Sequence, residues 1–474
     1  MSNEAAEILA LRRDQESAKG DSGDLLDGLL SRSVSTFLIK GVPGAGKSTL
    51  ALELLRRLGG GTYVSTRVSR ESLSSQNPQV TLVALRGMAE EMTVGEVPLD
   101  ARDFRLAGAK EIVGLVFDKV NVDPGSLIVL DSWDSIAKEL DPVERLRAEK
   151  TIVTVVQAHE SKLAFISEEP ERTTTDYLVD AIIELSSEVS YGSIMRRMEV
   201  KKLRGMPIRT PTLQYTLTGG RFRILEPPKI LLPGQYAPKR YTPIVSASDR
   251  YSSGIPDLDR LLGGGLYRGL TVALEFKRDF PAYMHSPFVQ VNAANLMTNG
   301  SGYVFLPSVG VSGRVFLDSL GTYLPKELLD SKLRVGSYRH SETASVFNLT
   351  ASEVEATFEE VWKAMEELDK SGPLPSTIHI GVDKLEAIHG PAKLQRHISK
   401  TISKVKRSNG TATFVVRENT ANKDSIVGMC DSHHILDLKD RAIIVQSVKP
   451  FNGASNIEYD YSSGWPQVRM IPIE

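Results

Sequence analysis

The most constraining feature of this chain lies in residues 37–56, which read FLIKGVPGAGKSTLALELLR. An apolar run that predicts a buried strand leads into a glycine-rich loop, and an amphipathic stretch that predicts a helix follows directly. Gly41, Gly44 and Gly46 permit backbone conformations that let successive amides turn inward around an anion. The start of the helix adds its positive end at the same place. The segment therefore predicts a strand–loop–helix unit that binds phosphate.

The pattern Gly41-x4-Gly46-Lys47-Ser48 is a complete Walker A motif. Lys47 is expected to contact the β- and γ-phosphates of ATP, and the Ser48 hydroxyl is expected to ligate Mg²⁺. A glycine-rich turn with a chance lysine is the alternative, and the correct placement of both strand and helix argues against it. We expect the nucleotide to contact Gly41, Val42, Pro43, Gly44, Ala45, Gly46, Lys47, Ser48 and Thr49.

An acidic candidate follows in residues 126–134, SLIVLDSWD. Asp131 ends a continuous apolar run, as expected for a buried parallel strand whose carboxyl end faces a nucleotide. There its carboxylate can hold Mg²⁺, usually through water, and act with Lys47 in catalysis. An ordinary strand-ending aspartate is the alternative, and the Walker A motif upstream favours the magnesium role.

The chain as a whole reads as two similar halves. Residues 226–248 hold five prolines and predict an extended linker, because proline lacks a backbone donor and disfavours helix. On either side, short apolar runs alternate with helical stretches, and the runs 126–132 and 377–383 both contain an acid near their end. This alternation predicts an α/β fold with mainly parallel, helix-covered sheets, and the similar order indicates an internal duplication. We therefore expect domains at residues 1–225 and 249–474.

Composition narrows the class of protein. The 474 residues carry 57 Lys and Arg against 59 Asp and Glu, and 41% are apolar, so the chain is neither basic throughout nor largely disordered. Cys430 is the only cysteine, which excludes an intramolecular disulfide and a cysteine-based zinc site. The adjacent His433 and His434 would point to opposite sides of a strand, a poor metal geometry. Without an apolar signal-peptide core or a run of about 18 apolar residues, we expect a cytoplasmic protein whose only metal is magnesium.

Three stretches resemble RecA-fold ATPases of the KaiC-like branch, which carry two such domains in tandem. They are the Walker A loop, SGIPDLDRLLGGGLYRG at 253–269 and RRMEVKKLRG at 196–205. Within that branch, TYVSTRVSRESL at 62–73 is similar to archaeal GvpD-like proteins, a group of gas-vesicle regulators. The combination of an intact first P-loop with a degenerate second one is also similar to that group. The resemblance implies two tandem RecA-like domains, ATP and Mg²⁺ as cofactors, and assembly into a homo-oligomer such as a hexamer.

One departure from the KaiC-like pattern affects the expected chemistry. In that branch the strand after the Walker A helix ends in paired glutamates, one of which polarises the attacking water, and here the matching positions are Arg67 and Val68. Hydrolysis by that route therefore lacks its general base. Acids elsewhere are candidate replacements, although the ordinary role of each is that of a solvated surface acid. They are Glu71, Asp134, Glu168 and Glu169.

A second departure lies in the second half, where residues 277–283, KRDFPAY, follow a strand-like run. They contain no glycine nest and no Gly-Lys-Ser, and the bulky Phe280 and Tyr283 oppose a tight amide cradle, as does Pro281. We expect a degenerate P-loop that binds no nucleotide in the standard manner. Asp383, the counterpart of Asp131, is then expected to be a relic of the fold.

Two basic stretches contrast with the near-neutral total charge. In residues 196–205, alternation along a strand places Lys202 and Arg204 on one face with Met198 and Val200. The resemblance to KaiC-like hexamers makes Lys202 and Arg204 candidate catalytic fingers that reach the γ-phosphate of a neighbouring subunit. The alternative is a solvated basic edge strand that discourages aggregation.

The second basic stretch, residues 393–407, reads KLQRHISKTISKVKR and has apolar residues at helical spacing. Its opposite side carries Lys393, Arg396, Lys400, Lys404 and Arg407. These cations can bind the phosphates of nucleic acid or an acidic partner protein. A solvated helix face is the more ordinary interpretation, and no aromatic residues interleave the lysines to form a stacking platform.

Together these features predict an ATP-binding, slowly ATP-hydrolysing regulator that acts as a nucleotide-dependent switch on a protein partner, with transcriptional regulation as one candidate setting. The γ-phosphate is expected to order the loops near residues 66–69 and after Asp131. Two alternatives stay open. A DNA-binding ATPase of the recombinase or repair type is supported by the 393–407 stretch, and a scaffold that binds ATP without turnover is supported by Arg67 and Val68.

Overall fold

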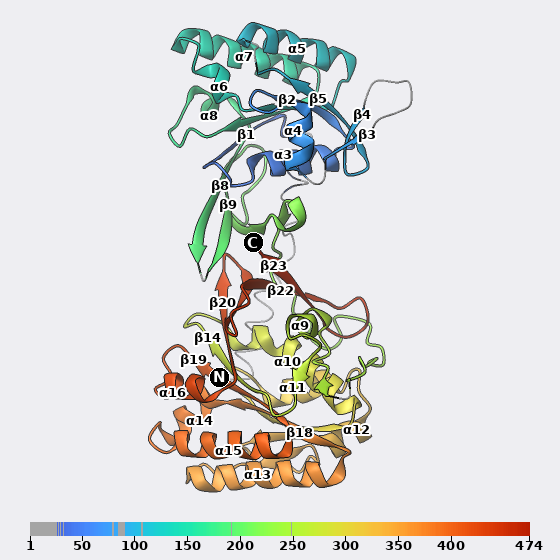
Figure 1. Ribbon diagram of the computed structural model, residues 1–474, viewed down its shortest axis with the longest axis vertical. Helices are drawn as coiled ribbons and strands as arrows, with labels where there is room; N and C mark the ends of the chain where they lie inside the picture. Colours follow the sequence, from blue (N-terminus) through green and yellow to red (C-terminus); the bar gives the residue numbers. More distant parts are fainter. Residues whose placement is uncertain are drawn as a thin grey trace. The chain divides into compact units, whose positions relative to one another are not determined.

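In the computed structural model the chain forms two compact units, one ending at Glu226 and one beginning at Pro227, with Ile473–Glu474 grouped with the first (Figure 1). The structure describes residues 26, 28, 30–31, 33–77, 80–83, 91–105, 108–190, 192–247 and 249–474. The expected start of the first domain, residues 1–25, lies outside them. Each unit is an α/β structure built on one large sheet.

An eleven-stranded sheet forms the centre of the first unit, in the order β11-β10-β9-β8-β1-β7-β6-β2-β5-β4-β3. The strands are β1 Thr36–Gly41, β2 Gly61–Ser65, β3 Val80–Val83, β4 Glu91–Val94, β5 Val97–Asp103, β6 Leu127–Asp131, β7 Lys162–Ser167, β8 Ala181–Ser190, β9 Ser193–Leu203, β10 Thr212–Thr216 and β11 Arg223–Ile224. The strands from β8 to β5 in this order run parallel. Antiparallel strands extend the sheet at both ends.

Helices cover both faces of this sheet (Figure 1). They are α3 Lys47–Arg57, α4 Arg70–Gln76, α5 Ala109–Val122, α6 Asp134–Ala137, α7 Pro142–Ala158 and α8 Thr174–Leu178. The apolar sides of α5 and α7 pack with Leu38 and Ile128 on one face, and α3 packs with Phe37 and Ile39 on the other. This double cover explains why β6 and β7 are apolar almost throughout.

The second unit has a ten-stranded sheet in the order β17-β16-β15-β18-β19-β14-β20-β21-β22-β23 and a two-stranded sheet of β12 and β13. The strands are β12 Arg250–Tyr251, β13 Leu266–Tyr267, β14 Thr271–Phe276, β15 Ser301–Leu306, β16 Leu333–Ser337, β17 Val346–Asn348, β18 Leu374–Gly381, β19 Thr411–Arg417, β20 Ser432–Lys439, β21 Ala442–Lys449, β22 Ala454–Asp460 and β23 Gln467–Ile473. The helices are α9 Pro256–Leu261, α10 Ser286–Thr298, α11 Gly313–Leu320, α12 Lys326–Lys332, α13 Val354–Ser371, α14 Val382–His389, α15 Leu394–Ser408 and α16 Lys423–Met429.

The two sheets share the order of five parallel strands. In the first unit the order is β8-β1-β7-β6-β2, and in the second it is β20-β14-β19-β18-β15. Numbered along the chain within each set, both read fifth, first, fourth, third, second. In both units the fifth strand then pairs with an antiparallel successor. This common order agrees with the internal duplication predicted from the sequence.

Three details differ from the strands that the sequence predicts. β9 lies between β8 and β10, so it is not the edge strand that one interpretation of residues 196–205 required. It ends at Leu203, which leaves Arg204 in the following turn. Asp383 does not end β18 but lies in the first turn of α14. Strand boundaries depend on neighbouring strands, and the local sequence pattern does not contain them.

The proline-rich segment contains no helix or strand over residues 226–247. It packs on the second unit through Tyr241, which is buried against Tyr323 and Trp465. In the same unit Cys430 is fully buried, and burial raises the pKa of its thiol to about 12. Within the described parts of the chain, none of the helices combines the length and apolarity that crossing a bilayer requires.

Candidate nucleotide-binding site

The glycine-rich loop joins β1, which lies between β7 and β8, to the start of α3 at Lys47. Gly46 immediately precedes the helix with φ of 89°, a left-handed conformation that glycine adopts without strain. A Cβ at this position would lie 2.9 Å from the side chain of Leu217. From β10, the Tyr215 hydroxyl donates a hydrogen bond to the Ala45 carbonyl. The antiparallel extension of the sheet therefore braces the loop from one side.

Lys47 is held inside the loop rather than extended into solvent. Its Nζ donates to the carbonyls of Gly41 at 2.9 Å and Val42 at 3.0 Å, and it lies 3.5 Å from the Glu168 carboxylate. The residue is only 6% exposed. Burial lowers the pKa of Lys47, and the neighbouring Glu168 carboxylate opposes that effect. The ammonium group is thus preorganised beside the loop that would hold a phosphate.

Ser48 and Asp131, the two candidate magnesium ligands, lie in contact. The Ser48 hydroxyl donates to Asp131 Oδ2 at 2.5 Å. Asp131 ends β6, next to β2, and the hydroxyl of Tyr63 in β2 donates to the same carboxylate oxygen. Burial raises the pKa of Tyr63 well above its usual value, so this phenol stays protonated and acts as a donor. Tyr63 therefore fixes the orientation of Asp131.

Arg67 and Glu168 form the next layer of the site. Arg67 Nη1 lies 2.7 Å from Glu168 Oε1, and the Arg67 hydrogen bond holds the pKa of Glu168 below its usual range. Glu168 directly follows β7, and its backbone N–H donates to Asp134 at 2.5 Å. Because Glu168 also neighbours Lys47, a single carboxylate links the glycine-rich loop to the loop that follows β2.

Thr66 ties the loops after β2 and β6 together. Its hydroxyl donates to the carbonyls of Asp131 and Ser132, and it accepts from the Ser132 N–H at 2.9 Å. The Ser135 hydroxyl also donates to the Thr66 hydroxyl, with 2.6 Å between the two oxygens. The two segments expected to respond to a γ-phosphate therefore share one hydroxyl, which couples their positions.

Of the four acids considered as replacements for the absent glutamate pair, only Glu168 contacts Lys47. Glu71 is exposed in the first turn of α4, and Glu169 lies 3.4 Å from Arg145. Asp134 is 1% exposed, so the expectation of a solvated acid is wrong for it. Burial of Asp134 follows from its place in the short helix α6 beneath Glu168, which only the tertiary structure defines.

The donor set fits a magnesium nucleotide. Mg²⁺ prefers oxygen ligands and usually keeps several waters and phosphate oxygens, so Ser48 and Asp131 suffice as its protein ligands. A Cβ at Gly41 would collide with the Leu185 carbonyl oxygen of the neighbouring strand β8, so this position requires glycine. Among the described residues, no group of three or more His, Cys, Asp and Glu side chains could hold a metal ion. A cation here would therefore depend on the phosphates.

The two candidate fingers are bound to their own unit. Lys202 Nζ donates to the Asp176 carbonyl at 2.8 Å, and an Arg204 nitrogen donates to the Tyr177 carbonyl at 3.1 Å. Arg204 also lies 3.5 Å from Asp180, while its side chain is 54% exposed. To act on a neighbouring subunit, both side chains would have to leave these carbonyl partners.

The loop of the second unit is filled by its own side chains. Phe280 is 1% exposed and packs on Phe276, with ring centroids 4.9 Å apart. Asp383 pairs with Arg417 at 3.1 Å and accepts from the Val309 N–H at 3.2 Å. Its carboxylate is thus used inside the fold, and burial raises its pKa.

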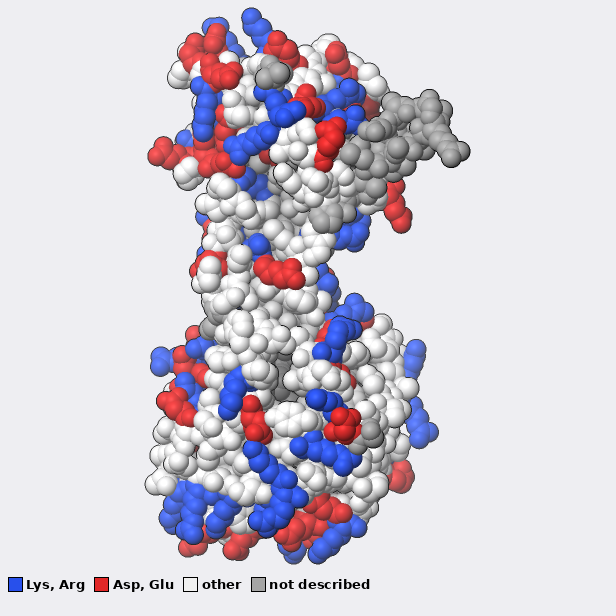
Figure 2. All heavy atoms as spheres, in the orientation of Figure 1, with Lys and Arg blue, Asp and Glu red and all other residues white. Residues whose placement is uncertain are grey.

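The basic helix surface of residues 393–407 belongs to α15, whose apolar stripe is buried as predicted. The buried residues include Leu394, Ile398, Ile402 and Val405. Lys404 pairs with Glu366 of α13 at 3.0 Å, and Lys393 lies 3.7 Å from Glu355. Trp362 of α13 lies beneath Lys400 and Lys404, an aromatic contact that the sequence of the helix alone does not contain. Figure 2 shows acidic side chains intermixed with the basic ones in this region.

A glycine-rich loop between a central parallel strand and a helix, with Lys47, Ser48 and Asp131 at its mouth, defines a P-loop protein. Residues 29–201 match the family described as GvpD gas vesicle protein, P-loop domain. Over 466 residues the chain is 23% identical to Protein GvpD2 of Halobacterium salinarum, covering 92% of this chain and 93% of that protein. It is 25% identical over 316 residues to Protein GvpD1 of the same organism, covering 63% of this chain and 58% of that protein. Most of the chain is therefore similar to GvpD proteins, and its first unit resembles their P-loop domain.

Proposed function

We propose that the first unit binds Mg-ATP and that the protein acts as a nucleotide-dependent regulatory switch on a protein partner. This proposal rests on the contact between Ser48 and Asp131 at 2.5 Å, beside the buried Lys47. The contact places the two candidate magnesium ligands next to the lysine that would bind phosphate. When bound, Mg-ATP supplies a γ-phosphate whose presence or absence can distinguish two states. The description of the matched family, GvpD gas vesicle protein, P-loop domain, supports a role connected with gas vesicles.

The proposed switch begins at Glu168. A phosphate at Lys47 would compete with the Glu168 carboxylate for the same ammonium group, and two anions in one site repel each other. Displacement of Glu168 would move its partner Arg67, and Thr66 would transmit that movement to the loop after Asp131. This order of events links nucleotide binding to residues 66–69.

Hydrolysis is proposed to be slow. The best-placed acid, Glu168, is paired with Arg67, and the low pKa of Glu168 makes it a weak proton acceptor at neutral pH. The fingers Lys202 and Arg204 would assist only in a homo-oligomer, which we include in the proposal on the resemblance to KaiC-like proteins. A scaffold that binds ATP without turnover is the second candidate, favoured by the same Arg67–Glu168 pair.

We further propose that both units are RecA-like and that the second has lost its nucleotide site. The shared strand order supports the common origin. Two observations support the loss of the nucleotide site. The bulky side chain of Phe280 fills the loop where a phosphate would bind, and Asp383, the counterpart of the magnesium ligand, is paired with Arg417.

Lys47→Ala tests the nucleotide site. We expect affinity for Mg-ATP to fall at least about 100-fold, because charge-assisted contacts to two phosphates are lost. Isothermal titration calorimetry on the full chain measures this, with Lys150→Ala as the control, since Lys150 is exposed on α7. Undiminished affinity of Lys47→Ala would refute the site. Phosphate release measured beside ATP binding separates the slow ATPase from the scaffold.

A further inference from the structure

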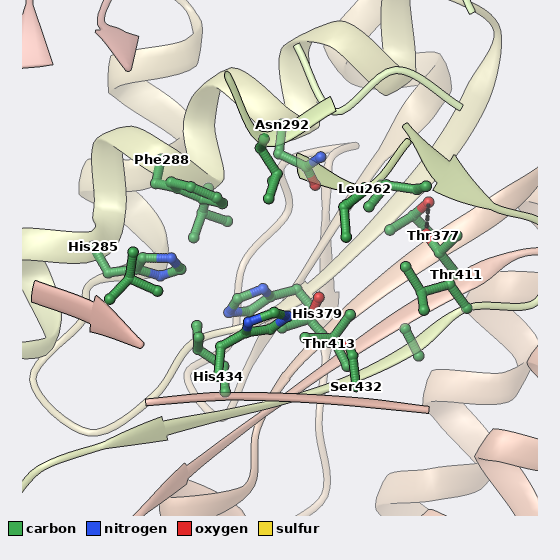
Figure 3. Close-up of a pocket in the computed structure, with 18 of the residues that line it drawn as sticks. Leu262, His285, Phe288, Asn292, Thr377, His379, Thr411, Thr413, Ser432 and His434 are labelled. Atoms are coloured by element: carbon green, nitrogen blue, oxygen red, sulfur yellow. Dashed lines mark hydrogen bonds between the residues drawn. The ribbon is translucent and has the colours of Figure 1, made fainter. Parts of the chain in front are cut away.

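The second unit contains a cavity of about 100 Å³ between one face of its sheet and the helices α9 and α10 (Figure 3). Apolar side chains form most of its wall, including Leu262, Phe288 and Val289. The cavity lies beneath α10, at the middle of the sheet, and none of the glycine-rich loop residues of the first unit contributes to it. It is therefore a feature separate from the proposed nucleotide site.

The sheet face that borders this cavity is unusually polar for a covered parallel sheet. Alternate positions on three strands carry hydroxyl or imidazole groups, namely Thr377 and His379 on β18, Thr411 and Thr413 on β19, and Ser432 and His434 on β20. His379 lies opposite Thr413 in the strand register. The other face of the same strands is apolar, with Ile378, Ile380, Ala412 and Phe414 all buried in one core cluster. Buried parallel strands are normally apolar on both faces, so the polar residues need a partner.

Two of the imidazoles lack such a partner among the residues that the structure describes. His285, next to α10, is 4% exposed and His379 is 6% exposed, and their rings are 6.4 Å apart. No residue that the structure describes forms a hydrogen bond with a ring nitrogen of His285 or His379. The buried hydroxyl of Ser432 likewise has no hydrogen-bond partner among the described residues. His434, by contrast, bonds to Ser447 at 3.0 Å. Figure 3 shows the three imidazoles directed into the same space.

The wall of the cavity is uncharged at neutral pH. It includes no acidic or basic side chain among the described residues apart from its histidines. Burial lowers the pKa of His285 and of His379 to about 3, and that of His434 to about 4, so all three are neutral. A neutral imidazole offers one donor and one acceptor. A ligand must therefore be uncharged and able both to donate and to accept a hydrogen bond.

The volume limits the size of the ligand. An apolar protein cavity of about 150 Å³ holds one benzene molecule. The present cavity is smaller, which limits the occupant to one ring or an aliphatic group of no greater size.

We propose that the second unit binds a small, uncharged, mainly apolar molecule that carries a hydroxyl group, of the size of phenol, with His285 and His379 as its hydrogen-bond partners. The ring or chain of the ligand packs against Phe288 and Val289. In this arrangement the second unit has a ligand site inside its sheet–helix layer, distinct from any nucleotide site.

Calorimetric titration of the full chain with phenol tests the proposal, with benzene and benzoate as comparison probes. We expect phenol to bind about tenfold more tightly than benzene, because two hydrogen bonds are added, and benzoate to show no binding. His379→Leu should reduce the preference of phenol over benzene to about threefold while both still bind, because the hydrogen bond to His285 remains. Val289→Phe, which fills the cavity, should weaken both probes. His397→Leu, which alters a histidine buried against Phe358 and Trp362, is the matched control and should change neither.

Absence of phenol binding would overturn the proposal, as would equal affinity for phenol and benzene or tighter binding of benzoate. If His379→Leu fails to fold, His285→Leu provides the same comparison. The titrations contain no nucleotide, and Lys47→Ala should bind phenol as the unaltered chain does. Failure of the cavity proposal is therefore distinguishable from failure of the ATP site.

Discussion

At the scale of single residues, Glu168 holds a position that bears on both the proposed nucleotide binding and the proposed hydrolysis. It lies between Lys47, which would contact phosphate in the proposed site, and Arg67. An anion at this point opposes nucleotide binding electrostatically and competes for the ammonium group of Lys47. The same anion is the candidate base nearest to the loop.

Glu168→Gln separates these two effects. We expect affinity for Mg-ATP to rise about fivefold, because the removal of one partly exposed charge contributes about 1 kcal/mol. If Glu168 accepts the proton of water, phosphate release should fall about 100-fold or more in the same variant. Glu169→Gln is the control, since its partner is Arg145 rather than Lys47. A loss of ATP affinity in Glu168→Gln would contradict the proposed competition.

The main ligands of the site were predictable from sequence, and their supports were not. Lys47 and Ser48 belong to a continuous motif, and Asp131 ends an obvious apolar run. Tyr63 reaches Asp131 only because β2 and β6 are neighbours, and Tyr215 reaches Ala45 only because the sheet continues past β8. Contacts of this kind depend on strand order, which no local pattern contains.

At the scale of elements, α15 shows how a neighbouring helix changes the meaning of a charge pattern. The apolar stripe of α15 was predictable, because helical periodicity is local. The basic side allows two interpretations from sequence, a solvated helix face and a phosphate-binding surface, and neither includes the contacts of Lys404 with Glu366 and Trp362 of α13. Part of the basic surface is thus used for packing two helices together.

Lys404→Glu should therefore destabilise the second unit by about 1 kcal/mol, through the lost ion pair and cation–π contact. Arg396→Glu, on the first turn of the same helix, should cost nothing, because an acid is favourable near a helix N-terminus. Urea unfolding followed by tryptophan fluorescence in a Trp133→Phe background, which leaves Trp362 and Trp465 as reporters in the second unit, measures both. Equal destabilisation by the two reversals would show that the α13 contact contributes no stability.

At the scale of the whole molecule, one strand order supports two different interiors. The first unit places its functional groups at the carboxyl ends of β1 and β6, as an α/β sheet with a loop-bound ligand requires. The second unit fills that edge with Phe280 and has polar groups within the sheet instead. The alternating Thr–x–His and Thr–x–Thr pattern of residues 377–379 and 411–413 is the sequence signal, but it identifies a cavity only when the strands are known to be neighbours.

This interior makes the stability of the second unit dependent on pH. His285, His379 and His434 stay neutral in the folded protein down to about pH 4, whereas in the unfolded chain they titrate near pH 6.5. Below about pH 6.5 the unfolded chain therefore binds protons that the folded unit does not. The free energy of unfolding should fall as pH decreases, by up to about 1.4 kcal/mol per pH unit for each histidine.

Urea unfolding between about pH 7 and about pH 5, in a Trp133→Phe background that leaves Trp362 and Trp465 as reporters, measures this slope. His379→Leu should reduce the slope of the unfolding free energy against pH by the contribution of one proton. An unchanged slope in His379→Leu would mean that this imidazole is protonated in the folded unit.

The burial of Cys430 has a practical consequence for following the proposed switch. The chain has no other thiol, and this one is inaccessible and stays protonated near neutral pH. The unmodified chain is therefore already a background-free host for maleimide labelling, with no native cysteine to remove. A cysteine introduced at Ser69, beside the loop that Thr66 anchors, would carry a fluorophore or spin label at that one place.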